Sequence, residues 1–163
     1  MSALDFLSPD ACGPDVALVS PLRYAVQDVS LVDRSLLGKL EVRGDVERLE
    51  AADGEQVLPL GPGRALVVVE GSPAAARRRL TAGGFRVYDM TAALAALEFE
   101  GEDILRRLTE LEPAQLPATG SIARGTPALV TQREGGRFRV YVPQELGHFV
   151  AEVVADLGLG LGR

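Results

Sequence analysis

The stretch Leu40-Glu41-Val42-Arg43-Gly44-Asp45 recurs in related form as Leu97-Glu98-Phe99-Glu100-Gly101-Glu102. In both copies the alternating apolar residues predict a strand, and the glycine ends it before a helix. A polar Asp-x-Ser/Thr turn leads into each strand, Asp28-Val29-Ser30 in the first copy and Asp89-Met90-Thr91 in the second. We interpret the two stretches as copies of one strand–helix unit, and the alternative is a chance similarity between two generic units.

A strand and a helix close each copy. In the first copy, Ala65-Leu66-Val67-Val68-Val69 predicts a central strand. Ser72-Pro73 then predicts the start of a helix, because serine caps helix N-termini and proline is favoured at the first helical position. In the second copy, a hairpin with strands at 128–133 and 137–142 leads into the last helix at 143–157.

Two such units can cover one another's apolar sheet faces. The sequence therefore predicts one α+β domain at residues 22–157, built from pseudo-repeats at about 28–83 and 89–157 that are related by a pseudo-twofold axis. Residues 1–21 are expected to form an irregular arm, and residues 158–163 a flexible tail. The remaining expected elements are strands at 35–43, 56–60, 64–70, 85–88 and 92–99, a short helix at 45–52, and helices at 74–82 and 102–111. The last helix is expected to bury Leu146, Phe149, Val150, Val153 and Val154.

The composition favours a folded, acidic protein. Of the 163 residues 47% are hydrophobic and 25% are charged, and the net charge is −6. Nucleic-acid binding needs clustered positive charge, so we expect no nucleic-acid partner. No apolar run reaches the ~18 residues that span a bilayer, and residues 1–7 lack the basic segment of a signal peptide. We therefore expect a cytoplasmic protein with no membrane partner.

Few residues are suited to catalysis. Cys12 is the only cysteine and His148 the only histidine, which excludes a disulfide within the chain and any metal site that needs several histidines. Asp28 and Asp89 either form a pair of carboxylates or serve as turn formers, and we favour the turn. The run Arg77-Arg78-Arg79 is either a binding patch or, as we favour, the solvated face of a helix. We assign no catalytic residue and no metal site.

Four stretches in order resemble a known family. Asp89-Met90-Thr91, followed by the strand and helix from Leu97, resembles the Asp-x-Ser, strand and Gly-Pro-x-Ala-helix signature of the folate-binding aminomethyltransferase superfamily, which includes the glycine-cleavage T protein. Residues 58–67 are similar to its Leu-Gly-Pro-Asp-Glu-Trp-Leu segment, and residues 120–126 to its Gly-x-x-x-x-Thr strand entry. Residues 138–143 and the closing helix resemble its Phe-x-Leu-x-Val-Pro-x-Ser-Phe ending. Within the superfamily, the gamma subunits of heterotetrameric sarcosine oxidases are the most similar group.

The sequence also departs from that family's catalytic members. Catalytic T proteins carry an Asp-Asp pair after a glycine-rich hairpin, and the corresponding hairpin at 131–139 holds no aspartate. The resemblance therefore implies the fold and a place in an oxidase complex, and it transfers no catalytic residue.

Three functions compete. The leading hypothesis is a non-catalytic accessory subunit that packs against the large subunits of a sarcosine-oxidase-type flavoenzyme. The second is a stand-alone protein that binds a folate, such as tetrahydrofolate, or another small anion, with Arg64, Arg124 or Arg137 meeting its carboxylates in a central cleft. An unrecognised enzyme is the third. Under the leading hypothesis the leader at residues 1–21 docks on a neighbouring chain or on the sheet edge of a symmetry mate, and a homodimer that uses the same surface is an alternative for the isolated chain.

Overall fold

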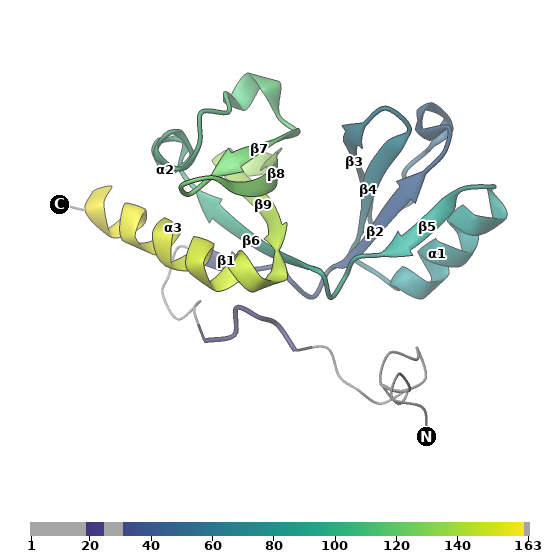
Figure 1. The fold of residues 1–163 in the computed structure, drawn as a ribbon, viewed down its shortest axis with the longest axis horizontal. Coiled ribbons are helices and arrows are strands. Elements are labelled where there is room, and N and C mark those ends of the chain that lie inside the picture. Colours follow the sequence, from purple (N-terminus) through teal and green to yellow (C-terminus); the bar gives the residue numbers. More distant parts are fainter. Residues whose placement is uncertain (1–18, 25–30, 162–163) are drawn as a thin grey trace.

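The computed structural model describes residues 19–24 and 31–161, and it contains two antiparallel β-sheets that form two lobes (Figure 1). The five-stranded sheet has the order β1-β6-β9-β8-β7, and the four-stranded sheet has the order β3-β4-β2-β5. The expected α+β class is confirmed. In chain order the elements are β1 (Leu31–Asp33), β2 (Gly38–Arg43), β3 (Glu55–Gly61), β4 (Arg64–Val69), α1 (Pro73–Ala82), β5 (Arg86–Asp89), β6 (Leu94–Glu100), α2 (Glu102–Leu108), β7 (Ala118–Ile122), β8 (Thr126–Arg133), β9 (Arg137–Pro143) and α3 (Gly147–Leu161).

Each sheet carries helices on its outer face, and the inner faces meet. Val150 and Val154 of α3, with Leu105 of α2, pack on the five-stranded sheet. Ala76 and Leu80 of α1 pack on the four-stranded sheet. A third apolar cluster joins the two inner faces, and it contains Leu58, Leu66, Val68, Ala96, Leu129 and Tyr141. Burying these three layers supplies most of the apolar stabilisation.

The two sheets exchange their edge strands. β1 precedes β2 in the chain but pairs with β6, and β5 precedes β6 but pairs with β2. Asp33 therefore lies opposite Leu97, while Asp89 lies opposite Leu40. Each lobe thus contains a strand from the other part of the chain, which ties the lobes together.

Matching turns make these exchanges. Oδ1 of Asp33 accepts a hydrogen bond from the Ser35 backbone N–H at 2.9 Å, and Oδ1 of Asp89 accepts one from Thr91 N–H at 2.9 Å. The hydroxyl of Ser35 accepts from Ala96 N–H, and that of Thr91 from Lys39 N–H, both at 3.1 Å. The turn role of Asp89 is confirmed. Asp28 lies outside the described residues, and the turn that makes the same bonds as Asp89-Met90-Thr91 is Asp33-Arg34-Ser35.

The helix starting after Ser72 is confirmed: it begins at Pro73, and the Ser72 hydroxyl accepts from Ala75 N–H at 3.4 Å. The three arginines 77–79 are exposed on it, as expected for a solvated helix face. The hairpin across residues 134–136 is also confirmed.

Three expected helices differ from the structure. Residues 45–52 contain only a 3₁₀ turn, Val46–Arg48. The helix expected at 102–111 ends at Leu108, because Thr109 is extended and its hydroxyl donates to Ser121 O at 2.8 Å instead. The last helix begins at Gly147, after a 3₁₀ turn at Gln144–Leu146, and continues to Leu161 past the expected end at 157. The buried face of α3 is centred on Val150, Ala151 and Val154, and Phe149 lies outside it, 38% exposed rather than buried.

Candidate functional site

A cavity of about 450 Å³ lies between the inner face of the five-stranded sheet and the end of β4. We call it the arginine pocket, and its lining residues are Arg34, Leu37, Glu70, Glu98, Arg133, Arg137 and Arg139. Its size falls in the range of small-molecule sites. Among its side chains, four arginines face two glutamates, which leaves an excess of two positive charges.

The pocket is organised around a buried ion pair. Glu98 on β6 lies directly opposite Arg139 on β9, so the two side chains project to the same face of the sheet. Arg139 donates to Oε2 of Glu98 from Nη2 at 2.8 Å and from Nε at 3.0 Å. Only 2% of the Glu98 side chain and 4% of the Arg139 side chain are exposed. Arg139 also donates from Nη1 to the Tyr141 hydroxyl at 3.4 Å.

Two further arginines approach the same carboxylate. Arg137 donates from Nη1 to Oε1 of Glu98 at 3.1 Å. Nε of Arg34 lies 3.6 Å from Oε2, beyond hydrogen-bond distance, and this buried atom has no hydrogen-bond partner among the described residues. One carboxylate therefore neutralises only part of the charge of three guanidinium groups.

The ion pair keeps its charges at neutral pH. Burial raises the pKa of Glu98, but hydrogen bonds from Arg139 and the charges of Arg139, Arg34 and Arg137 outweigh it, so the pKa lies below its ordinary value. Burial lowers the pKa of Arg139, and its contacts with Tyr141 and Glu98 reverse this to a raised value. Burial also raises the pKa of Tyr141, which stays neutral.

The fourth arginine links the two sheets. Arg133, at the end of β8, donates from Nη1 to Oε1 of Gln56 on β3 at 2.8 Å. Its partner is an uncharged amide, so the positive charge of Arg133 adds to the excess in the pocket. Gln56 in turn donates to Thr131 Oγ1 at 3.4 Å, which fixes the amide between the sheets.

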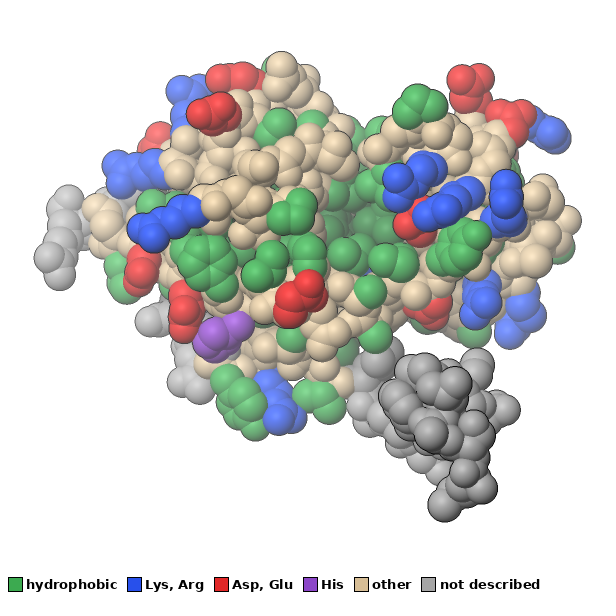
Figure 2. All heavy atoms as spheres, viewed as in Figure 1, with side chains coloured by type: hydrophobic (Ala, Val, Ile, Leu, Met, Phe, Trp, Pro, Cys, Tyr) green, Lys and Arg blue, Asp and Glu red, His purple; other side chains and the backbone are tan. Residues whose placement is uncertain are grey.

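A second ion cluster sits on the four-stranded sheet. Oε1 of Glu41 accepts from Arg43 Nε at 2.7 Å and from Arg64 Nε at 3.0 Å. Burial raises the pKa of Glu41, but the hydrogen bonds and charges of these two arginines bring it below its ordinary value. Glu41 also lines a mostly apolar cavity of about 300 Å³ between the sheets, with Leu66, Leu94 and Tyr141 among its walls. Figure 2 shows hydrophobic side chains gathered in the hollow between the two lobes.

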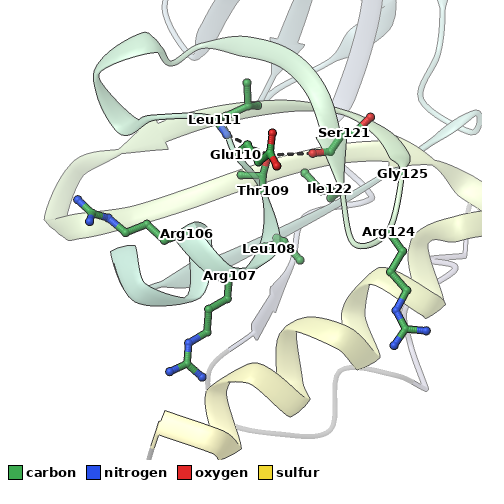
Figure 3. Close-up of a pocket in the computed structure, with 10 residues that line it drawn as sticks. All are labelled: Arg106, Arg107, Leu108, Thr109, Glu110, Leu111, Ser121, Ile122, Arg124 and Gly125. Carbon is green, nitrogen blue, oxygen red and sulfur yellow. Dashed lines mark hydrogen bonds between the residues drawn. The ribbon is translucent and has the colours of Figure 1, made fainter.

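Another cavity, of about 670 Å³, lies beside α2 and the β7–β8 turn (Figure 3). Its three arginines, Arg106, Arg107 and Arg124, extend in separate directions rather than toward a common point. Arg106 is engaged by Glu102 on the helix surface. This cavity therefore lacks converging charges.

The three arginines named from the sequence are not brought together. Arg137 lies in the arginine pocket, Arg64 in the Glu41 cluster, and Arg124 beside α2. Sequence reasoning missed Arg34, Arg133 and Arg139. The available signal was Arg137-x-Arg139 in a strand opposite a mid-strand glutamate, since charged residues at alternating positions share one face.

Other candidate groups take structural or peripheral positions. The buried Lys39 donates from Nζ to the carbonyl oxygens of Ser35 at 2.6 Å and Leu37 at 3.0 Å, and burial lowers its pKa to about 8. His148 is exposed on α3, with Nε2 3.0 Å from Glu152. Cys12 lies outside the described residues. Within residues 19–24 and 31–161, no His, Cys, Asp or Glu side chains cluster in a metal-binding group, and no helix there is both long and apolar enough to span a bilayer.

No protein-family model matches the sequence, and no curated protein matches it significantly. Among solved structures, a chain of heterotetrameric sarcosine oxidase from Corynebacterium sp. U-96, in complex with pyrrole 2-carboxylate, is similar with a TM-score of 0.67 and 18% identity. The match covers 87% of this chain and 95% of that chain. E. coli aspartokinase III matches far more weakly at 9% identity, with TM-scores of 0.40 in its T-state complex with lysine and aspartate and 0.41 in its R-state complex with aspartate and ADP. These cover 77% and 78% of this chain but only 31% and 32% of the aspartokinase chains. The fold of this chain is therefore similar to that of a sarcosine oxidase subunit.

Proposed function

We propose that this chain is a non-catalytic accessory subunit of a cytoplasmic, amine-oxidising flavoenzyme complex of the sarcosine oxidase type. The observation that supports it most is the likeness in fold, which covers 95% of a chain that belongs to a heterotetrameric sarcosine oxidase. The motif order from Asp89 to the closing helix points the same way. In this proposal the large subunits hold the flavin and carry out the chemistry.

The edges of the two sheets offer surfaces for the large subunits. β1 and β5 are edge strands, and each exposes an apolar side chain, Val32 at 43% and Tyr88 at 44%. An unpaired edge with apolar side chains favours pairing with another chain. A stable interface buries about 800 Å² on each partner, so the contact would extend beyond these two residues.

Co-purification tests this proposal. The tagged chain would be co-expressed with the FAD-binding and NAD-binding oxidase subunits of its own organism. We expect a fixed-ratio complex that retains flavin absorbance, and we expect Tyr88→Glu to weaken it while Leu159→Glu, a matched exposed position on α3, does not. Purification of the chain alone from cells that contain soluble oxidase subunits would overturn the proposal.

A second candidate function is the binding of an anionic small molecule, and the arginine pocket favours it. The family resemblance implies tetrahydrofolate as the ligand, and its glutamate carboxylates are of the class that arginines bind. Arg137 is the one sequence-derived candidate that lines this pocket. Equilibrium dialysis of the purified chain against tetrahydrofolate tests this form of the proposal, and an absence of binding at millimolar ligand would remove it.

We also propose that the two lobes are copies of one unit related by a pseudo-twofold axis. The order β3-β4-β2-β5 corresponds to β8-β9-β6-β1, with α1 matching α3. The correspondence extends to side chains, since Arg64 pairs with Glu41 as Arg137 pairs with Glu98. A superposition of the two four-strand sets in an experimental structure would test the duplication.

A further inference from the structure

We propose that the arginine pocket binds a compact dianion, a dicarboxylate or a phosphate, held by Arg34, Arg137 and Arg133. The inference deepens the second candidate function by naming the ligand class and the residues that bind it. It does not depend on the subunit role, because an isolated chain would bind the ion equally well.

The charge of the pocket sets the charge of the ligand. All three side-chain nitrogens of Arg139 already donate hydrogen bonds within the protein. Nε and Nη2 donate to one carboxylate oxygen of Glu98, and Nη1 donates to the Tyr141 hydroxyl. The remaining arginines have only Glu98 and the exposed Glu70 as acidic neighbours in the pocket. Two positive charges remain uncompensated, and a dianion would neutralise them.

The free donors of Arg34 and Arg137 determine which groups can bind. Nε of Arg34 is buried without a hydrogen-bond partner among the described residues, although 39% of its side chain is exposed toward solvent. Arg137 uses Nη1 on Glu98 and Nε on the Glu134 carbonyl at 3.2 Å, and its side chain is 47% exposed. Each guanidinium has five N–H donors in a planar fork that matches the oxygens of a carboxylate or phosphate. Both residues therefore have donors left for an incoming anion.

Hydrogen bonds within the protein hold the residues behind these donors in fixed positions. Arg139 and Glu98 are nearly fully buried and form the floor of the pocket, while the hydrogen bond from Arg133 to Gln56 on β3 holds the Arg133 side chain in place. Arg133 and Arg137 lie opposite each other on β8 and β9, so a ligand that contacts both would bridge these two neighbouring strands. Ligand binding should therefore stabilise the folded chain against unfolding.

The test is thermal and chemical unfolding of the full chain at pH 7 with succinate, inorganic phosphate or acetate, each at constant ionic strength adjusted with sodium chloride. We expect saturable stabilisation by succinate or phosphate, and the stronger of the two identifies the ligand as a dicarboxylate or a phosphate. Acetate should bind at least about tenfold more weakly, because it lacks a second charge-assisted contact.

Substitutions of single residues test whether the anion binds in the arginine pocket. Arg34→Gln and Arg137→Gln should each weaken binding about tenfold, the loss expected for one charge-assisted hydrogen bond. Arg64→Gln is the matched control, because it also removes an arginine paired with a buried glutamate but lies outside the pocket, and it should leave binding unchanged. Glu70→Gln removes an exposed negative charge from the rim and should strengthen binding.

Three results would overturn the proposal. The first is an absence of saturable stabilisation by both dianions, and the second is acetate binding as tightly as they do. The third is equal loss in Arg64→Gln and Arg137→Gln, which would mean that bulk charge and not the pocket responds. The subunit proposal is read from co-purification, so either proposal can fail while the other stands.

Discussion

The Glu98 carboxylate on β6 and the Arg139 guanidinium on β9 form an ion pair that is almost completely buried between two sheets, with an N–O distance of 2.8 Å. Removing one member of a buried pair leaves the other charge uncompensated, which costs far more than losing an exposed pair. The pair therefore links the stability of the fold to the geometry of the arginine pocket.

The first prediction concerns this pair. Glu98→Gln should lower the free energy of unfolding by about 3 kcal/mol at pH 7, because Arg139 is left buried without a counter-charge. Glu102→Gln is the control, because its ion pair with Arg106 lies at the surface, with 50% of the Glu102 side chain and 64% of the Arg106 side chain exposed. We expect this substitution to change the free energy of unfolding by less than about 1 kcal/mol. Urea denaturation measures both.

The same pair predicts a pH dependence. The folded-state pKa of Glu98 is depressed, so its stabilisation is present above the unfolded value of about 4.3 and is lost as the pH falls through the folded value. The difference in stability between wild type and Glu98→Gln should therefore shrink in acid. A difference that stays constant from pH 7 to pH 3 would contradict the assignment of a charged Glu98.

A second prediction concerns the start of α3. A Cβ atom on Gly147 would lie 2.6 Å from the Cβ of Ala95 on β6 and 3.1 Å from Leu22. Helix propensity alone would make Gly147→Ala stabilising by about 1 kcal/mol, but we expect destabilisation by about 2 kcal/mol through overpacking. Gly160→Ala in the same helix has open space around it and should not destabilise the chain.

Ala95→Gly should partly rescue Gly147→Ala, because it removes the atom that the new methyl group meets. The free energies of unfolding of the two single variants and the double variant form a thermodynamic cycle. Strict additivity of the two changes would show that this contact does not limit the packing of α3 on β6.

A third prediction concerns Lys39. Its pKa is lowered by burial to about 8 from 10.5, so the unfolded chain binds more protons between these values. The free energy of unfolding should therefore rise with pH across this window. We expect wild type to gain about 3 kcal/mol relative to Lys39→Met between pH 7.5 and pH 10.5. Denaturant unfolding at several pH values measures the difference, and a flat difference would show that Lys39 is not titrating there.

The sequence predicted local elements well where their signals were local. Ser72-Pro73 specified the start of α1, and the glycines at 135 and 136 specified the hairpin between β8 and β9. The start of α3 was misplaced, because the residues after Pro143 form a 3₁₀ turn before the helix begins at Gly147, and Phe149 was wrongly assigned to the buried face. No local sequence signal distinguishes that turn from a first helical turn.

The sequence pattern matched the two strands of the proposed repeat, but it paired Asp89 with a different turn from the one that makes the same bonds. The strands around Glu41 and Glu98 were matched, whereas Asp28 was chosen as the partner of Asp89 when the turn with the same bonds contains Asp33. The arginine pocket could not be predicted for a related reason. Arg34, Glu98 and Arg133 come together only through the strand order β1-β6-β9-β8 of the five-stranded sheet, which is a tertiary feature.

Native mass spectrometry of a sarcosine-oxidase-type complex tests whether this chain is one of its subunits. The complex would be purified with and without co-expression of this chain, under conditions that preserve its bound flavin. We predict that each assembly gains one copy of the chain, a mass increase of 17.3 kDa per complex. An oxidase complex of unchanged mass in the presence of excess folded chain would show that the chain is not a subunit of it.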